Sequence, residues 1–544
     1  MRHGLAFLLA LTVAAGACAA PSTPEGASAK PARVIVVALD NYHFSDVRRA
    51  MPNLYGFVQK GAWTDASHHP ALPTRTAPNF ASIASGQYPD RHGAILNSFQ
   101  APGGTPRVGF AYWENLAKLT PPPFLSEPPW VAFNKAGFDV GAVGMQGLVL
   151  ESKAEAKGLL GRDLGDEELD QYWGLAVHRK DGTAAIGTAQ IPALKEVVPS
   201  GWLNGWGGPP LKSASLTLPM ATALLRTGIP VVFTYVENTH QRCTGTAPSS
   251  CLGNLADGTF DDLLRADDAA FGKWFTDLAA IGVTTSNTLF FVTTDEGDRY
   301  LPGYAKVIDT TALQPATNGA AGLFYGLDAE ALGAALGKSA DVQAIATKTA
   351  MKALHIAAGD PRTPTYAAFP ASDSYFNRGP CASCGRWNHG TIDPDINDIW
   401  LGIVGAGVRP GKLTAAFTDH PDIVATARYA LGIAAAPDQD GVPILPALAK
   451  ASSPELLAAR EAYKQLTAPF GALGTAILKL STAGVRGGAD ARAKADARIA
   501  DLVTRRDALA AELRPPLEGT VQRSAEVLKD TVTRASALIA DAGK

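Results

Sequence analysis

Short apolar runs alternate with helix-like stretches over most of this chain, and this alternation constrains its fold more than any other feature. The predicted strands are Arg33–Leu39, Val231–Tyr235, Thr288–Thr293 and Trp400–Val404, and the predicted helices between them are Met51–Lys60, Asn79–Ser85 and Ala266–Ala280. Because the strands are continuously apolar, both faces of their sheet must be covered. The sequence therefore predicts an α/β fold, a three-layer α/β/α sandwich around a mostly parallel sheet.

Acidic residues stand at the ends of three of these strands. Asp40, Glu237 and Asp295 each lie at or just after a predicted strand end. In a parallel sheet these ends share one edge, and ligands bind there. We therefore expect the three carboxylates to contribute to one site.

The N-terminus is typical of an export signal. Arg2 and His3 precede an apolar run, Leu5–Ala17, that is too short to span a bilayer. We interpret residues 1–20 as a signal peptide and residues 21–31 as a linker. The protein is then expected in the periplasm or cell envelope.

The end of that signal resembles a bacterial lipobox. In Ala15–Cys18 the cysteine would be lipidated and would attach the protein to a membrane. Leucine is usual at the position of Ala15, so ordinary cleavage near Ala19 is the alternative.

Four further cysteines pair most simply as two disulfides. In an oxidising compartment we expect Cys243–Cys251 and Cys381–Cys384. The alternative is a zinc site made by all four, which would require two distant loops to meet.

Composition divides the chain further. Residues 32–436 are expected to form the main domain, with an insertion at about residues 99–225 where the alternating pattern weakens. In residues 437–544, helix-like runs cover Glu455–Lys479, Ala489–Leu513 and Leu517–Ala542, with Pro515-Pro516 breaking the last two. Their spacing predicts a helical hairpin or small bundle. It is expected to pack on the main domain; self-association and a role as a membrane spacer are the alternatives.

Net charge excludes one class of partner. The formal net charge of the 544 residues is −3, without the basic clustering of a nucleic-acid scaffold.

The segment Met51–Asn97 carries a longer pattern, MPNLYGFVQKGAW…ALPTRTAPNFASIASGQYPDRHGAILN. It resembles the nucleotide pyrophosphatase/phosphodiesterase branch of the alkaline phosphatase superfamily. That family has a Pro-Asn-Leu helix, a Pro-Thr-Lys-Thr-Phe-Pro-Asn-His nucleophile turn, a Thr-Gly-x-Tyr-Pro-x-x-His-Gly run and an Asn. The matching positions are Met51–Leu54, Pro73–Asn79, Ser85–Pro89, His92-Gly93 and Asn97.

The resemblance implies that Thr76 is a nucleophile and that Asn97 hydrogen-bonds a phosphoryl oxygen. A threonine hydroxyl attacks phosphorus only when a cation or base lowers its pKa. At the start of a helix it also meets the N-terminal N–H groups that bind phosphate. Taken without the motif, Thr76 would be an ordinary helix-capping residue.

The superfamily uses two zinc ions, and the resemblance assigns ligands to each. For the nucleophile-side ion the matching positions are Asp40, Thr76, Asp295 and Glu296. The family has Asp-His-Gly where this chain has Asp295-Glu296-Gly297. Either Glu296 binds the metal in place of histidine, or it points away and Asp298 or another group substitutes. A carboxylate is a harder ligand than imidazole, so manganese, magnesium or calcium is more plausible here than in a typical family member, although zinc is still expected.

For the second ion the resemblance implies His240, Glu237 and the late His389, with Asn238 as an additional oxygen donor. The acid stands three residues before His240, whereas the family spacing is four. We expect His420 to begin a helix and not to bind metal.

The sequence thus predicts an exported, metal-dependent phosphoric ester hydrolase of the phosphodiesterase type, which acts on a small-molecule phosphoester through a phosphothreonine. Four carboxylates at the two metals favour diesters over the more charged monoesters. One alternative is a sulfatase or phosphonate hydrolase, but the Cys/Ser-x-Pro-x-Arg sequence of sulfatases is absent from the nucleophile turn. Another is a non-catalytic envelope binding protein that retains the fold.

Overall fold

A large sheet lies at the centre of the computed structural model, which describes residues 30–100, 107–109, 125–145, 175–186, 190–194, 196–197, 214–236, 259–300, 305–313, 321–326, 328–357, 362–377, 379–380, 387–414 and 416–544. Ten strands within these ranges join the sheet in the order β18-β2-β17-β9-β1-β8-β5-β6-β7, with β19 paired to β2. The strands are β1 Arg33–Leu39, β2 Ala62–His69, β5 Val140–Val143, β6 Leu175–His178, β7 Ala184–Ile186, β8 Val231–Val236, β9 Thr288–Thr294, β17 Ile399–Gly405, β18 Gly411–Lys412 and β19 Thr418–Asp419. The central strands β5, β8, β1 and β9 run parallel, and β17 lies antiparallel beside β9. The predicted mostly parallel sheet is confirmed.

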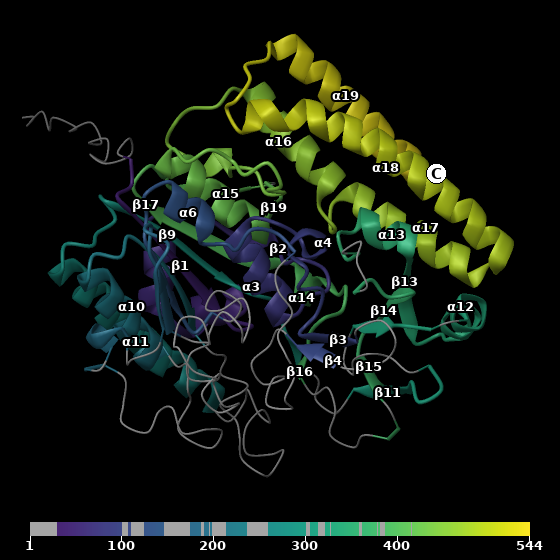
Figure 1. The fold of residues 1–544 in the computed structure, drawn as a ribbon, viewed down its shortest axis with the longest axis horizontal. Helices are drawn as coiled ribbons and strands as arrows, with labels where there is room; N and C mark the ends of the chain where they lie inside the picture. The colour runs from purple at the N-terminus through teal and green to yellow at the C-terminus, as the bar shows by residue number, and fades with distance from the viewer. Residues whose placement is uncertain are drawn as a thin grey trace, which may run out of the picture.

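Strand β1 shows how both faces of this sheet are covered. Val34 and Val36 belong to the core on one face, and Ile35 and Val37 to the core on the other. Successive strand residues point to opposite faces, so a continuously apolar strand packs on both sides. The first face is covered mainly by α3 (Thr76–Ser85), α6 (Val131–Lys135) and α15 (His420–Leu431), and the second by α1 (Phe44–Ala50), α2 (Pro52–Val58), α10 (Ala214–Arg226) and α11 (Thr259–Ala280). The three-layer α/β/α sandwich is therefore confirmed (Figure 1).

Three predicted helices have other boundaries in the structure. The helix expected over Ala266–Ala280 is α11, which begins at Thr259. The helix expected over Met51–Lys60 is α2, Pro52–Val58, and the sequence reasoning missed α1 before it. Met51 separates them at φ −125° and ψ 66°, because a residue that precedes proline disfavours the helical region. The helix expected from Asn79 begins three residues earlier, at Thr76.

The segment at about 99–225 is more than the expected insertion. Its strands β5, β6 and β7 are part of the central sheet, and its helix α10 packs on that sheet. These strands are only four, four and three residues long, too short for their apolar pattern to stand out in the sequence. Much of the remaining segment lies outside the described residues.

Smaller elements complete the fold. A second, antiparallel sheet has the order β12-β14-β13 and is flanked by α12 and α13. The bounds are β12 Gly322–Phe324, β13 Val342–Thr347, β14 Tyr366–Pro370, α12 Ala329–Lys338 and α13 Lys348–Ala353. The remaining short elements are β3 Ser98–Gln100, β4 Arg107–Gly109, β10 Arg299–Tyr300, β11 Lys306–Asp309, β15 Ser374–Asn377, β16 Trp387–Asn388, α4 Pro89–His92, α14 Pro394–Asn397, η1 Pro192–Leu194 and η2 Leu445–Ala447.

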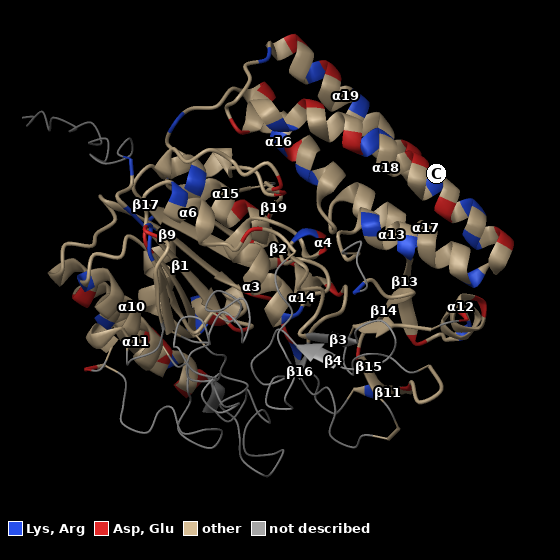
Figure 2. Ribbon diagram, viewed as in Figure 1, with Lys and Arg blue, Asp and Glu red and all other residues tan. Residues whose placement is uncertain are grey.

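Four helices follow and form what we call the C-terminal bundle. They are α16 Pro454–Thr467, α17 Ala472–Arg486, α18 Ala489–Leu517 and α19 Ala525–Ala542. Acidic and basic residues are interspersed along α18 and α19 in Figure 2, as expected for the solvated side of amphipathic helices. The expected hairpin or small bundle is therefore a four-helix arrangement.

Prolines explain where the predicted C-terminal helices were wrong. The run Glu455–Lys479 is two helices, because Pro469 follows Ala468, which is extended at ψ 144°. Pro515 and Pro516 do not break α18, which continues to Leu517. They stand in its last turn, where each lacks the N–H of one backbone hydrogen bond, and the helix ends directly after them. The last helix begins at Ala525, where the Ser524 side chain caps the Val527 N–H.

A large apolar cluster joins the C-terminal bundle to the rest of the molecule. Ile477, Leu502 and Leu513 of the bundle join Leu354 and Phe369 of the preceding unit in this cluster. The side chains of the bundle come from α17 and α18, and those of the preceding unit from the end of α13 and from β14. No helix in the described part of the chain combines the length and apolarity needed to cross a bilayer.

Candidate functional site

The proposed nucleophile stands at the start of a buried helix. Thr76 is the first residue of α3 and is 4% exposed. The next backbone group, the Ala77 N–H, donates to Asn97 Oδ1 at 2.8 Å. The two residues that the sequence assigned to phosphoryl chemistry therefore lie together at the N-terminal end of α3.

Glu296 points toward this hydroxyl and not away from it. It follows β9 and is fully buried. Thr76 Oγ1 donates to Glu296 Oε1 at 3.2 Å, and Asn79 Nδ2 donates to Glu296 Oε2 at 3.1 Å. Of the two orientations left open by the sequence, the structure thus has the one directed at the Thr76 hydroxyl.

Asp40 and Asp295 lie beside Glu296 at the ends of β1 and β9. Tyr235 and Asn41 each donate to one carboxylate oxygen of Asp40, both at 2.6 Å. Asp295 Oδ1 accepts from the Glu296 N–H at 3.0 Å. Its Oδ2 is buried and has no hydrogen-bond partner among the residues that the structure describes. An unpartnered buried carboxylate oxygen is suited to bind a cation.

The electrostatics of this cluster also favour a cation. Burial raises the pKa of Asp295 well above its ordinary value, and the neighbouring Glu296 and Asp40 raise it further. Burial likewise raises the pKa of Glu296, an effect that Arg75 opposes and Asp40 reinforces. Three buried carboxylates repel one another unless positive charge is placed among them.

His389 joins the same cluster from the residue directly after β16. Its Nδ1 lies 2.6 Å from Asp298 Oδ1, and its Nε2 lies 3.5 Å from Glu296 Oε1. Asp298 is thus the partner of His389, a relation that the sequence did not predict.

Several predicted site residues lie outside the described residues. They are Glu237, Asn238 and His240 of the second metal site, the cysteines Cys243, Cys251, Cys381 and Cys384, and Cys18. Within the described ranges, no group of three or more His, Cys, Asp or Glu side chains is arranged to hold a metal ion as it stands. The ligand set for two metals therefore stays a prediction.

Sequence reasoning missed two supporting residues. Asn79 belongs to the quoted motif, but only the fold shows that its side chain bridges Glu296 and the Ala71 N–H. His420 begins α15, as expected, and its Nδ1 and Nε2 lie 3.0 Å from Asn79 Oδ1 and 3.1 Å from the Thr294 carbonyl. No sequence signal placed it beside the nucleophile.

Comparisons with known proteins concern the family and the fold. Residues 34–298 match the family model of type I phosphodiesterase / nucleotide pyrophosphatase. Murine ectonucleotide pyrophosphatase / phosphodiesterase 5 shares the fold with a TM-score of 0.50 at 14% identity, over 74% of this chain and 96% of that chain. Its inactive threonine-to-alanine variant, in complex with AMP, gives the same values. No curated protein matches this sequence.

The range of the family model includes α3 and the carboxylates Asp40, Asp295 and Glu296. Over residues 34–298 the chain matches the family of type I phosphodiesterases and nucleotide pyrophosphatases, as the motif around Thr76 predicted, and this match indicates a hydrolase of phosphoester bonds.

Proposed function

We propose that this protein is an exported, metal-dependent phosphodiesterase that forms a covalent phosphothreonine at Thr76. The observation that carries the proposal is the contact between the Thr76 hydroxyl and the buried Glu296 carboxylate, 3.2 Å apart at the N-terminus of α3. A nucleophile needs such an acceptor for its proton and such a helix end for the anion that it attacks.

The residues present fit a divalent cation on the nucleophile side. Asp40, Thr76, Asp295 and Glu296 would hold it, and the unpartnered Asp295 Oδ2 supports this assignment within the described part of the chain. Zinc is proposed first, with manganese, magnesium or calcium as alternatives beside Glu296. When bound, such an ion lowers the pKa of the hydroxyl and offsets phosphoryl charge. For a second ion we propose His389 together with Glu237, His240 and Asn238.

The chain's own groups account for the transfer of the proton and the phosphoryl group. Thr76 Oγ1 forms a bond to phosphorus while its proton moves to Glu296 Oε1, and the bond to the leaving oxygen breaks. The leaving oxygen takes up a proton to depart as the alcohol, and Glu296 returns its proton to solvent. Asn97 Oδ1 is held by the Ala77 N–H, which leaves the amide nitrogen of Asn97 as the donor to a phosphoryl oxygen. Water then cleaves the phosphothreonine and restores the hydroxyl.

Export and substrate class are further parts of the proposal. The signal-like residues 1–20 support delivery to the periplasm or cell envelope, with lipidation of Cys18 as the form attached to a membrane. The AMP complex of the murine relative supports a small-molecule phosphoester as the substrate.

Hydrolysis of bis(4-nitrophenyl) phosphate tests the proposal. We expect turnover by the wild type, its loss in Thr76→Ala, and its retention in Thr74→Ala, whose hydroxyl is bound to the Thr391 carbonyl at 3.1 Å. The loss should exceed about a thousandfold if Thr76 is the covalent nucleophile. Acid-quenched wild type should yield a phosphopeptide that contains Thr76. Full activity of Thr76→Ala would refute the covalent route.

Removal of metal gives a separate test. Dialysis against a chelator should abolish turnover, and readdition of zinc or manganese should restore it. Elemental analysis of the purified protein should find a divalent metal. Undiminished turnover by a protein that contains none would contradict metal dependence.

A further inference from the structure

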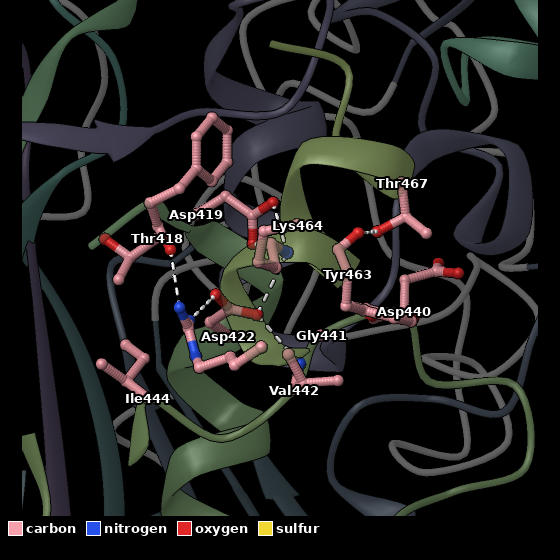
Figure 3. Close-up of polar contacts among 12 residues, drawn as sticks. Thr418, Asp419, Asp422, Asp440, Gly441, Val442, Ile444, Tyr463, Lys464 and Thr467 are labelled. Carbon is pink, nitrogen blue, oxygen red and sulfur yellow. Dashed lines mark hydrogen bonds and ion pairs between the residues drawn. The ribbon is translucent and has the colours of Figure 1, made fainter. Parts of the chain in front are cut away.

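Two cations of the C-terminal bundle are buried against the catalytic unit. Arg460 and Lys464, both on α16, are 1% and 0% exposed. Lys464 Nζ lies 2.6 Å from Asp419 Oδ2 and 3.1 Å from Asp422 Oδ1, and Arg460 Nη2 lies 2.6 Å from Asp422 Oδ2. Figure 3 shows Lys464 directed at the two carboxylates. The two cations and two carboxylates balance in charge, which burial requires.

These cations hold one corner of the fold, residues 417–422, where β19 leads into α15. Arg460 Nη1 donates to the Phe417 carbonyl at 2.7 Å. The Tyr88 hydroxyl also donates to the Asp419 carboxylate. The start of α15 is therefore fixed by side chains that arrive from α16 and from the segment after α3.

The same corner also contacts the hydrolase site. His420, directly after Asp419, contacts Asn79 Oδ1 at 3.0 Å and the Thr294 carbonyl at 3.1 Å. Asn79 in turn donates to Glu296 Oε2 at 3.1 Å. A continuous series of buried contacts thus runs from the C-terminal bundle to the carboxylate that accepts the Thr76 hydroxyl.

We propose that Lys464 is a positioning residue of the hydrolase site. It acts through Asp419 and His420, which keep Asn79 against Glu296. The inference rests on the proposed function of Thr76 and Glu296. It makes the C-terminal bundle part of the catalytic apparatus, in addition to its packing role.

The variant Lys464→Met tests this role, with Lys529→Met as the matched control. Lys529 is on the same bundle, but it is exposed and its ion pair with Glu455 is 3.4 Å long. In the full-length, metal-loaded protein well below its melting temperature, Lys464→Met should lower kcat about tenfold and leave KM unchanged, because small displacements at the reacting groups reduce rate. Lys529→Met should change neither. A folded Lys464→Met protein with wild-type kcat would overturn the proposal.

A double-mutant cycle separates this route from general destabilisation. If Lys464 acts through His420, Lys464→Met should cause no further loss of kcat in a His420→Gln background. Equal losses in the two backgrounds would overturn the proposed route. If Lys464→Met does not fold, the charge-balanced double variant K464M/D419N replaces it, with the same expectations.

Hydrogen exchange measures the coupling without reference to activity. Lys464→Met should speed exchange in peptides that cover residues 76–85, whereas Lys529→Met should not. Unchanged exchange there would overturn the positioning role. A wild type that hydrolyses no phosphoester would refute the proposed function, and the exchange result would still decide whether the bundle and the nucleophile helix are coupled.

Discussion

At the scale of single residues, Glu296 distinguishes this site from the family pattern. A histidine at its position would be a neutral ligand, whereas the carboxylate adds one negative charge beside Asp40 and Asp295. Asn79 Nδ2 donates to Glu296 Oε2 at 3.1 Å, so the orientation of the Glu296 side chain is fixed. The clustered negative charge repels an anionic substrate, and the carboxylates also repel one another.

This charge leads to a prediction for substrate preference. The wild type should prefer bis(4-nitrophenyl) phosphate to 4-nitrophenyl phosphate, because the monoester brings more negative charge to the carboxylates. Glu296→His should raise the monoester-to-diester ratio of kcat/KM by about tenfold, as one repulsive charge is removed. The isosteric Glu296→Gln is the control for shape. A strong monoester preference in the wild type would contradict the prediction.

At the scale of elements, α3 is joined to the short helix that follows it by a buried histidine. His92, the last residue of α4, is fully buried, and its Nε2 lies 3.0 Å from Ser82 Oγ of α3. Its Nδ1 accepts from the Ala94 N–H at 3.1 Å. The ring therefore serves in its neutral form, and burial lowers its pKa to about 3.

The titration of His92 predicts acid sensitivity. In the unfolded protein the imidazole ring of His92 titrates near its ordinary pKa of 6.5. In the folded protein the ring stays neutral down to about pH 3. The folded state thus binds fewer protons, so stability is lost as pH falls below 6.5, at about 1.4 kcal/mol per pH unit. The variant His92→Asn isolates this effect, because the asparagine amide oxygen can still accept from the Ala94 N–H but does not titrate.

Unfolding in urea at pH 7 and pH 5 measures this effect. Between these conditions His92→Asn should lose about 2 kcal/mol less than the wild type. An equal loss in both proteins would show that His92 is not the group responsible.

At the scale of the whole molecule, the C-terminal bundle closes a core that the preceding unit leaves open. Leu354 and Ile356 beside α13 pack in the same apolar cluster as Leu502 and Leu509 of α18. The bundle therefore packs on the catalytic unit, as expected from the sequence. Self-association through the bundle stays a prediction.

Truncation tests this packing. A chain that ends at Lys450 would expose the cluster residues now covered by α17 and α18. Exposed apolar surface of this kind promotes aggregation, so we expect the truncated chain to be insoluble or to unfold without cooperativity. A soluble truncated chain that melts at the wild-type temperature would show that the bundle is an independent unit.

The sequence by itself determined the fold class and the first half of the candidate site. Continuous apolar strands such as Arg33–Leu39 require a sheet that is covered on both faces, and the motif around Thr76 predicts the nucleophile turn. Both signals are local, because each is carried by neighbouring residues in the chain.

Only the tertiary structure decided what surrounds Thr76. The direction of the Glu296 carboxylate, the pairing of His389 with Asp298, and the place of His420 all depend on contacts between remote segments. No periodicity encodes such contacts, since they arise when separate strands end at one edge of a sheet. For the same reason, the role that we propose for Lys464 becomes visible only once the C-terminal bundle is seated on that sheet.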